Sequence, residues 1–266
     1  MKVAIAGCAG RMGQTLVKKT LATLGVTLVS GSVRPGNPFV GEQVGVYINA
    51  STPGAILTDD PEEMFKSADA VIDFTTPDYS IMLGKLAEQH GKILICGTTG
   101  LKENGIAVLR KNARRARIVC SPNMSIGINI LLGLVEKVSA ILPPDECDIE
   151  IDEMHHRFKL DAPSGTALSL GAAAARGRNA QLADVREDSL RPGLSARKQG
   201  TVGFSVRRGG DVIGDHTVTF ACAGERIEIA HKSSNRDIYA GGALRAVLWA
   251  KDQQPGFYTM KDVLGL

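Results

Sequence analysis

The first 120 residues alternate short apolar runs with helix-like segments, and this alternation constrains the fold more than any other feature. Strands are expected at residues 3–6, 26–29, 71–74, 93–96 and 118–120. Since these runs are apolar on both faces and helical patterns separate them, they are typical of βαβ units in a parallel sheet that helices cover on both sides. Such sheets bind ligands at the carboxyl ends of their strands, so functional residues are expected in the loops that follow the runs.

The pattern changes after residue 123, where a helix is expected over residues 128–142. Four strand-like runs follow it, at residues 147–154, 202–206, 212–220 and 226–230. The last three runs have no helices between them and are joined by glycine-containing turns, which predicts hairpins in an open, mainly antiparallel sheet. The polar residues 176–200 are expected to form a surface excursion, and a last helix is expected over residues 238–251.

Composition excludes several classes of protein. An apolar content of 44% is ordinary for a globular chain and excludes a disordered or fibrous one. With 31 Lys and Arg against 28 Asp and Glu the net charge is +3, so neither a nucleic-acid groove nor a membrane-binding surface is expected. The apolar start of the chain is cut short by Arg11, and no run approaches the roughly 20 residues that span a bilayer. Neither export nor a membrane anchor is therefore expected.

The cysteines bear on the cellular compartment. They are Cys8, Cys96, Cys120, Cys147 and Cys222. Because they are scattered, odd in number and free of any CxxC pair, they argue against a disulfide framework and against a thiolate zinc site. A cytoplasmic, reducing location is expected.

A glycine-rich loop, Gly7-Cys8-Ala9-Gly10-Arg11-Met12-Gly13, follows the first expected strand. The helix expected after it has an apolar face formed by Met12, Leu16, Val17, Leu21 and Leu24. A strand, a tight glycine turn and a helix N-terminus present unpaired backbone N–H groups to a pyrophosphate, and Arg11 adds a direct charge. The spacing is GxxGxxG instead of GxGxxG, because Ala9 stands at the middle position, so the loop alone also fits a plain βα turn.

The end of the second strand bears on which dinucleotide is bound. Residues Gly31-Ser32-Val33-Arg34 contain no carboxylate for the ribose hydroxyls of NAD, whereas Ser32 and Arg34 both offer contacts to the extra phosphate of NADP. The sequence therefore favours NADPH over NADH. The alternative, that Arg34 is only a solvated loop charge, leaves this preference open.

The string Glu153-Met154-His155-His156-Arg157-Phe158-Lys159-Leu160-Asp161-Ala162-Pro163-Ser164-Gly165-Thr166 concentrates groups that move protons and bind anions. A histidine gives or takes a proton near neutral pH, and Lys159 either holds a carboxylate or serves as the acid itself. Ser164-Gly165-Thr166 enters an Ala-rich helix and forms a second anion site, which suits a dicarboxylate. The alternatives are that Ser164 or Thr166 is only an N-cap and that the histidines lie on the surface. No metal is expected, because adjacent histidines do not chelate easily and no HExxH or cysteine partner accompanies them.

These motifs closely resemble the dihydrodipicolinate reductase family, also called 4-hydroxy-tetrahydrodipicolinate reductases, of the diaminopimelate route to lysine. The resemblance covers nearly the whole chain. It rests on the loop from Gly7 to Gly13, on Asp73-Phe74-Thr75, on Gly97-Thr98-Thr99-Gly100, on Pro122-Asn123-Met124-Ser125 and, above all, on the string from Glu153 to Thr166.

The resemblance implies hydride transfer from NADPH or NADH to C4 of a small, cyclic, unsaturated dicarboxylate. His155 would be the proton donor, and Lys159 would assist while it binds a carboxylate. Substrate contacts are implied for His156, Lys159, Ser164, Gly165 and Thr166. The cofactor-binding residues expected from the loop, from the second strand and from the resemblance are Gly7, Cys8, Ala9, Gly10, Arg11, Met12, Gly13, Arg34, Phe74, Gly97, Thr98, Thr99, Ser121, Pro122, Asn123 and Met124.

The resemblance also implies an α/β fold with two domains. Residues 1–126, completed by residues 236–266, would form a Rossmann-type parallel-sheet dinucleotide-binding domain. Residues 127–235 would form an α+β domain with an open mixed sheet that binds the substrate, carries the catalytic residues and forms the oligomer. A sheet face without helices needs a cover, so a homo-oligomer is expected, and the resemblance implies a homotetramer. Ala9 and Val33 depart from residues common in the family, and both leave the cofactor preference open.

Two other hypotheses fit the first domain. A related nicotinamide-dependent dehydrogenase of an open-chain amino acid or semialdehyde would share that domain and differ in the second. A dinucleotide-sensing protein without catalysis would have no need of the His155 and Lys159 pair or of the Ser164-Gly165-Thr166 segment.

Overall fold

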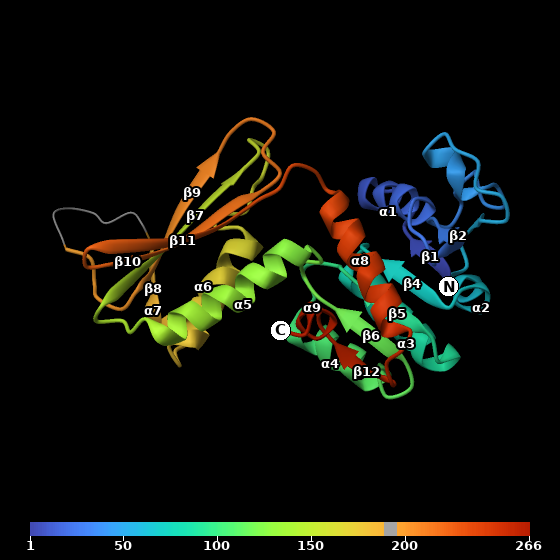
Figure 1. Ribbon diagram of the computed structural model, residues 1–266. Coiled ribbons are helices and arrows are strands. Elements are labelled where there is room, and N and C mark those ends of the chain that lie inside the picture. Colours follow the sequence, from blue (N-terminus) through green and yellow to red (C-terminus); the bar gives the residue numbers. More distant parts are fainter. Residues whose placement is uncertain (189–195) are drawn as a thin grey trace. The chain divides into compact units, whose positions relative to one another are not determined.

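The computed structural model describes residues 1–188 and 196–266 (Figure 1). The chain divides into two compact units: unit 1 is Met1–Ile126 with Arg236–Gly265, and unit 2 is Gly127–Asn235 with Leu266. Residues 189–195, part of the expected surface excursion, lie outside the described residues. The helices of the described part are all too short or too polar to span a membrane.

Unit 1 is built on a seven-stranded sheet whose neighbouring strands run parallel. The strands are β1 (Lys2–Ala6), β2 (Thr27–Ser32), β3 (Ile56–Thr58), β4 (Ala70–Asp73), β5 (Ile93–Cys96), β6 (Arg117–Cys120) and β12 (Gly256–Tyr258), in the order β12-β6-β5-β4-β1-β2-β3. The chain winds from β1 outward to β3, returns to β4 and then winds the other way. Sheets of this kind bind ligands where the winding reverses, here at the carboxyl ends of β1 and β4.

Helices cover both faces of this sheet. One face carries α1 (Arg11–Leu21), α8 (Asp237–Ala250) and α9 (Met260–Leu264), and the other carries α2 (Pro61–Ser67), α3 (Pro77–His90) and α4 (Glu103–Asn112); a short 3-10 helix, η1 (Val44–Tyr47), follows β2. Ile72 and Ile95 face the first layer, whereas Val71 and Leu94 face the second. Since successive strand side chains point to opposite faces, strands buried on both sides must be apolar throughout, as the sequence indicated.

All five strands expected in this part of the chain are present, and their bounds differ by a few residues. The second strand continues to Ser32, and the three-residue strands β3 and β12 were not expected because so short a run shows no periodicity. The predicted apolar face of α1 is wrong at its end. Leu21 is 48% exposed and Leu24 is 94% exposed, because the helix ends at Leu21.

Unit 2 contains a five-stranded mixed sheet. Its strands are β7 (Cys147–His155), β8 (Arg186–Asp188), β9 (Val202–Arg208), β10 (Asp215–Cys222) and β11 (Glu225–Lys232), in the order β11-β10-β7-β9-β8. The β10-β11 and β10-β7 pairs are antiparallel, whereas β7-β9 and β8-β9 are parallel. The expected run of hairpins is therefore wrong at β9, because β7 lies between β9 and β10. The segment at residues 176–200 is not a plain excursion either, since it includes α7 (Leu182–Val185) and β8.

Two helices, α5 (Ile126–Ile141) and α6 (Gly165–Gly177), cover the same face of this sheet (Figure 1). The core between these helices and the sheet is formed by Ile128, Leu131, Val135, Ile149, Ile151, Ala167, Leu170, Ala173, Ala174, Val202, Phe204, Val218 and Phe220. On β7 every second residue is buried, from Cys147 through Ile149 and Ile151 to Glu153 and His155. The row of buried side chains thus changes from apolar to ionisable at the carboxyl end of the strand.

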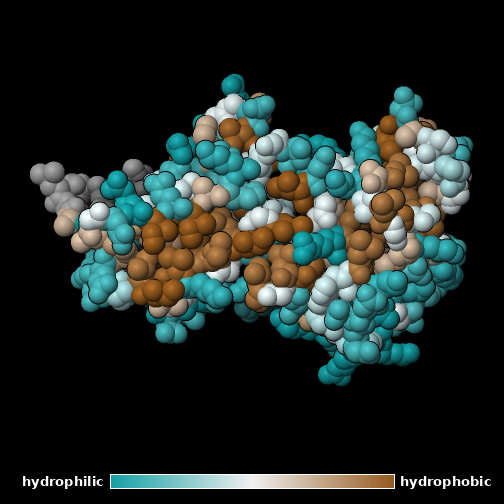
Figure 2. Space-filling view, in the orientation of Figure 1, coloured by the Kyte–Doolittle hydropathy of each residue, from teal (hydrophilic) through white to brown (hydrophobic). Residues whose placement is uncertain are grey.

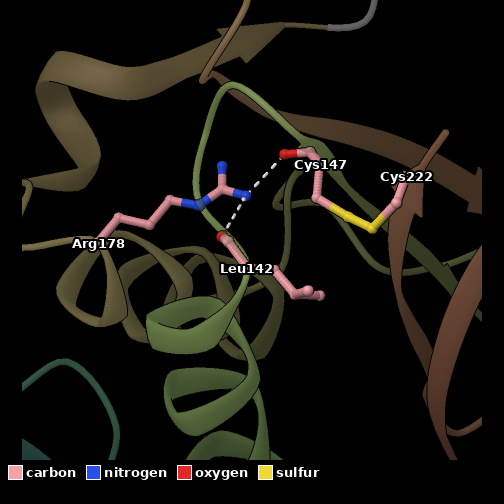
Figure 3. The surroundings of a disulfide bond; sticks show 4 residues. All are labelled: Leu142, Cys147, Arg178 and Cys222. Atoms are coloured by element: carbon pink, nitrogen blue, oxygen red, sulfur yellow. Dashed lines mark hydrogen bonds between the residues drawn. A yellow bond between two sulfur atoms is a disulfide. The ribbon is translucent and has the colours of Figure 1, made fainter.

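Cys147 and Cys222 form a disulfide (Figure 3). They lie directly opposite each other at one end of the β7-β10 ladder, although 75 positions separate them in the sequence. This disulfide is a correction to the sequence analysis, because only the register of the sheet brings the two residues together. Beside it, the Arg178 guanidinium donates hydrogen bonds to the carbonyl oxygens of Cys147, at 2.7 Å, and Leu142, at 3.2 Å.

Candidate active site

The glycine-rich loop connects β1 to α1 at the carboxyl edge of the unit 1 sheet. Gly7 has a φ of +64°, in the left-handed region that favours glycine. A Cβ on Gly13 would lie 2.2 Å from the carbonyl oxygen of Gly7, so only glycine permits this close packing of helix on loop. Gly10 is the N-cap and has no side-chain capping bond, which leaves the first N–H groups of α1 for a ligand.

The end of β2 holds the glycine-rich loop in place through Ser32. The Ser32 hydroxyl accepts a hydrogen bond from the Gly7 N–H at 3.2 Å and another from the Tyr79 hydroxyl at 3.2 Å. Ser32 is buried, which disfavours the expected contact between its hydroxyl and a cofactor phosphate, whereas Arg34 is exposed. Cys8 also packs into the core, and burial raises the pKa of its thiol to about 12.

The ends of β4 and β5 are joined by a buried carboxylate. Asp73 accepts hydrogen bonds from the Thr75 N–H at 3.0 Å and from the Thr98 hydroxyl at 3.2 Å, and Ser80 also donates to it. Burial raises the pKa of Asp73, while these hydrogen bonds act in the opposite direction. The Phe74 ring lies against Gly97, where a Cβ would stand 2.4 Å from the ring carbons. The carboxylate thus holds the two strand ends in place.

The loop after β6 completes this edge. Ser121 donates from its N–H to the Cys96 carbonyl at 3.1 Å and from its hydroxyl to the Asn123 carbonyl at 2.9 Å. Of the cofactor-binding residues expected at the ends of β5 and β6, Thr98 and Met124 are buried, whereas Thr99 and Pro122 are exposed. Thr98 and Met124 therefore support the edge from within, and the exposed pair is the part that a ligand meets first.

A hollow of about 610 Å³ lies at the opposite edge of the sheet, lined by residues that include Asp69, His90, Lys92 and Arg117. These residues precede or begin the strands, at their amino ends. Ligands of parallel sheets bind at the carboxyl ends, so a dinucleotide is expected at the edge that carries the glycine-rich loop and not in this hollow.

A second cluster lies in unit 2, at the end of β7. Glu153 and His155 are two residues apart on the strand, so both side chains point to the face that the helices cover. Nδ1 of His155 hydrogen-bonds the Glu153 carboxylate. The carboxylate also accepts from the Ser164 N–H at 2.9 Å and from the Arg208 guanidinium at 3.1 Å. Burial acts to raise the pKa of Glu153, but the hydrogen bonds from His155, Arg208 and Ser164 lower it to about 2.

Ser164 links this cluster to α6. It is the N-cap of the helix, and its hydroxyl oxygen accepts from the Ala167 N–H at 3.1 Å. The same oxygen lies 3.2 Å from Nε2 of His216, which stands directly opposite Glu153 on β10. Burial, followed by the nearby charge of His155, lowers the pKa of His216 to about 4. Ser164 is therefore the N-cap of α6, and the same geometry places its hydroxyl inside the cluster.

The loop after β7 carries Lys159, the cationic residue expected at the substrate site. Lys159 Nζ donates to both carboxylate oxygens of Asp161, at 2.8 and 2.9 Å. This contact lowers the pKa of Asp161. Arg208 fixes the loop by donating to the Asp161 carbonyl at 2.6 Å. Since the Asp161 side chain is 61% exposed, the ammonium group can leave it for a stronger anionic partner.

The remaining expected substrate residues differ in exposure. His156 lies just beyond the strand and is half-buried, so the two adjacent histidines do not share the buried row. Gly165 is exposed, with open space where a Cβ would stand, and Thr166 is half-buried in the first turn of α6. The structure thus brings His155 and Ser164 into one buried network and leaves Lys159, Gly165 and Thr166 at its surface.

Glu153, His155 and His216 also offer three metal-ligand atoms within 4.8 Å of one another. The Glu153 oxygens already accept hydrogen bonds from Arg208 and Ser164, and Nδ1 of His155 is bound to the same carboxylate. A cation bound by this carboxylate would have to compete with these donors. The sequence prediction that no metal binds here stays a prediction.

The sequence analysis missed three members of this network: Glu153 as a partner of His155, Arg208 and His216. Glu153 was recoverable, because the alternation of β7 places it on the face of His155. His216 and Arg208 lie on other strands, and their positions depend on which strands pair and in which register.

Comparison with known families decides the identity. A family model described as "Dihydrodipicolinate reductase, N-terminus" matches residues 1–124, and one described as "Dihydrodipicolinate reductase, C-terminus" matches residues 127–264. The chain belongs to the dihydrodipicolinate reductase family. The resemblance inferred from the motifs is confirmed, as is the prediction of an oxidoreductase of lysine and diaminopimelate biosynthesis with a nucleotide-binding N-terminal domain. Reductases of this family use NAD(P)H.

Curated relatives match over their full length. The 4-hydroxy-tetrahydrodipicolinate reductase of Rhizobium rhizogenes is 48% identical over 100% of this chain and 97% of its own. That of Brucella melitensis is 47% identical, over 100% of this chain and 99% of its own. Because both halves match the reductases, a dehydrogenase that shares only the first domain is excluded as the family.

Solved structures agree on the fold. A dipicolinate-bound dihydrodipicolinate reductase from Paenisporosarcina sp. TG-14 superposes with a TM-score of 0.79 at 21% identity, covering 97% of each chain. An amine dehydrogenase from Mycobacterium smegmatis reaches 0.60 at 10% identity, covering 98% of this chain and 95% of its own. At these identities the likeness concerns the fold alone, and the predicted fold class is confirmed.

Proposed function

We propose that this chain, a 4-hydroxy-tetrahydrodipicolinate reductase, forms tetrahydrodipicolinate by way of dihydrodipicolinate, with His155 as proton donor and Lys159 assisting. The observation that carries the proposal is the buried imidazole of His155, which is held by a carboxylate beside the N-terminus of α6. A proton donor needs a fixed ring and a solvent-shielded site, and this cluster supplies both.

The substrate is a dicarboxylate, and the surface of the cluster suits one. Among the described residues, the Lys159 ammonium group is held only by the exposed carboxylate of Asp161, whose place a substrate carboxylate can take. The N-terminus of α6, at Gly165 and Thr166, suits a second carboxylate through the helix dipole. His156, at the start of the loop after β7, is a further expected contact, and its carbonyl oxygen accepts a hydrogen bond from the Lys159 N–H at 3.1 Å. Two anion sites and one proton donor match a cyclic dicarboxylate that gains a proton as it accepts a hydride.

The dinucleotide fits the carboxyl edge of the unit 1 sheet. The tight turn has no room for a side chain at Gly7 or Gly13, and the uncapped first turn of α1 offers N–H groups to a pyrophosphate. Arg11, at the start of α1, adds a positive charge there, and Phe74 with Gly97 and Thr99 would face the nicotinamide. When bound, the cofactor supplies the hydride that adds to C4. Exposed Arg34 favours NADPH through the extra phosphate.

The experiment measures oxidation of NADPH and, separately, of NADH by the purified protein. Substrate is generated in situ from pyruvate and aspartate semialdehyde by the preceding synthase. Oxidation that depends on the synthase, faster with NADPH, is the expected result. Absence of oxidation with either cofactor, while both still bind, would exclude this substrate.

We also propose a homotetramer in the cytoplasm. Support comes from the helix-free face of the unit 2 sheet and from the exposed side chains of Ile130, Leu134 and Ile141 on α5, whose apolar surface is visible in Figure 2. Sedimentation equilibrium tests the proposal, and a concentration-independent mass near the 28.2 kDa of one chain would exclude it. The disulfide removes the cysteine argument for a reducing compartment, so the location rests on the biosynthetic role.

A further inference from the structure

The two ring nitrogens of His155 have different surroundings. Nδ1 faces the Glu153 carboxylate. Nε2 lies toward Gly214, where an added Cβ would stand 2.9 Å from it. Any side chain at residue 214 would collide with the ring, so glycine is required where Nε2 packs. Because the carboxylate occupies Nδ1, Nε2 is the nitrogen left for a reacting group.

We propose that Glu153 is a positioning residue, which holds His155 in the Nδ1–H tautomer and leaves Nε2 as the nitrogen that delivers the proton. The inference rests on the role proposed above for His155. An ionised carboxylate only accepts hydrogen bonds, so Nδ1 must carry the hydrogen between them. When the imidazolium gives its Nε2 proton to the substrate, the neutral ring keeps Nδ1–H on Glu153 and does not need to turn.

Glu153 is itself fixed. One carboxylate oxygen accepts from the Ser164 N–H and the Arg208 guanidinium, at 2.9 and 3.1 Å, and the other faces His155. The side chain is 1% exposed, so water cannot replace these donors. Rotation of the carboxylate would break at least two hydrogen bonds, one of them to a charged group. The orientation of His155 is therefore set by β9 and α6 as well as by its own strand.

An independent observation assigns the opposite tautomer, Nε2–H, to His216. Its Nδ1 is buried and has no hydrogen-bond partner among the described residues, whereas its Nε2 lies 3.2 Å from the Ser164 hydroxyl oxygen. A buried N–H without a partner is rarer and costlier than a buried acceptor without one. We infer that Nδ1 of His216 carries no hydrogen and that its Nε2–H donates to the Ser164 hydroxyl.

This assignment determines which hydrogen bonds the Ser164 hydroxyl accepts and which one it donates. Its oxygen then accepts from two donors, His216 Nε2–H and the Ala167 N–H. Both lone pairs are occupied, so its own hydrogen is left to donate to a ligand. His216 thus orients Ser164 toward a substrate carboxylate, as Glu153 orients His155 toward the atom that is protonated.

Nitrogen-15 NMR of the protein labelled at histidine tests both assignments without turnover. At a pH where the rings are neutral, the expected spectrum shows His155 as Nδ1–H and His216 as Nε2–H, although the ring centroids are only 5.1 Å apart. Spectra of the His155→Gln and His216→Gln variants assign the signals. An Nε2–H signal for His155 or an Nδ1–H signal for His216 overturns the corresponding inference, whatever the substrate proves to be.

Kinetics separate positioning from structure. Glu153→Gln is expected to lower kcat by on the order of 10²-fold or more with KM little changed, and to shift His155 to Nε2–H, because an amide can donate to Nδ1. Glu150→Gln is the matched control, three residues earlier on β7 and therefore on the opposite face, where it contacts Arg197. An unchanged kcat in Glu153→Gln, with NADPH binding and fold intact, overturns the proposal.

His216→Leu is expected to raise KM for the dicarboxylate about tenfold, which corresponds to the loss of one hydrogen bond to a charged group. His216→Gln keeps an amide donor that can reach Ser164 and is expected to restore most of the affinity. Equal KM values for wild type and His216→Leu, or equal losses for both variants, would show that His216 does not orient Ser164.

Discussion

The glycine-rich loop of unit 1 and the histidine cluster of unit 2 are both proposed above as anion sites, yet they are built in opposite ways. The loop offers backbone N–H groups at the start of α1, lies within the consecutive residues Gly7 to Gly13, and depends on missing side chains. The cluster uses ionisable side chains from β7, β9, β10 and the N-terminus of α6. One site is local in sequence, and the other exists only after the sheet has formed.

The difference determines how each site responds to change. Backbone N–H groups carry no proton that titrates, so the loop is insensitive to pH but cannot tolerate a Cβ. The cluster holds its charges in a buried environment, where a single proton changes the free energy of the folded state by several kcal/mol. Four predictions follow this contrast.

The largest effect is expected from His155→Gln. Proton transfer contributes about 10²–10⁴-fold to a rate, so kcat should fall by that factor, while the affinity for NADPH stays the same. Steady-state kinetics and a fluorescence titration of NADPH measure the two quantities. A parallel loss of cofactor affinity would show that the two sites are not independent.

Acid should destabilise the protein through the cluster. The pKa of His216 is lowered from 6.5 to about 4 in the folded protein. Between pH 6.5 and pH 4 the unfolded chain therefore binds a proton at His216, whereas the folded protein does not. Stability is full above pH 6.5 and falls between pH 6.5 and 4 by about 2–3 kcal/mol. Glu153, with its pKa lowered to about 2, adds a further loss below about pH 4.5. Urea unfolding at pH 7 and pH 4.5 measures the effect, and His216→Gln should reduce it.

Gly13→Ala tests the backbone site. The added Cβ would lie 2.2 Å from the Gly7 carbonyl oxygen, so the loop must shift, at a cost of about 1–3 kcal/mol. We expect NADPH affinity to fall at least tenfold and the histidine NMR signals to stay unchanged. The control is Gly241→Ala in α8, where the Cβ would lie 3.9 Å from its nearest neighbour. Full NADPH affinity in Gly13→Ala would exclude the loop as the pyrophosphate site.

The smallest effect is expected from Arg34→Asp. Arg34 is exposed, so its contact with a phosphate is screened and contributes about 1 kcal/mol. The variant should lose about fivefold in kcat/KM with NADPH and gain with NADH, which separate assays with each cofactor measure. An equal loss with both cofactors would mean that Arg34 contacts no 2′-phosphate.

The accuracy of the sequence analysis follows the same contrast. Strand β5 was predicted to the residue, and the loop from Gly7 to Gly13 was located, because apolar runs and glycine turns act over a few neighbouring residues. The expected hairpin between residues 202–206 and 212–220 was wrong, because β7 inserts between β9 and β10. The sequences of successive apolar strands do not indicate which strands pair with each other.

By itself the sequence determined the parallel sheet of unit 1, the glycine cradle and the string that carries His155 and Lys159, since local periodicity and motif spacing are properties of consecutive residues. Only the tertiary structure decided that His216 faces Glu153, that Arg208 holds the same carboxylate and that Cys147 meets Cys222. These contacts depend on strand order and register. Both are set by burial of the whole core, because a slip of one residue would turn every side chain of β7 to the other face.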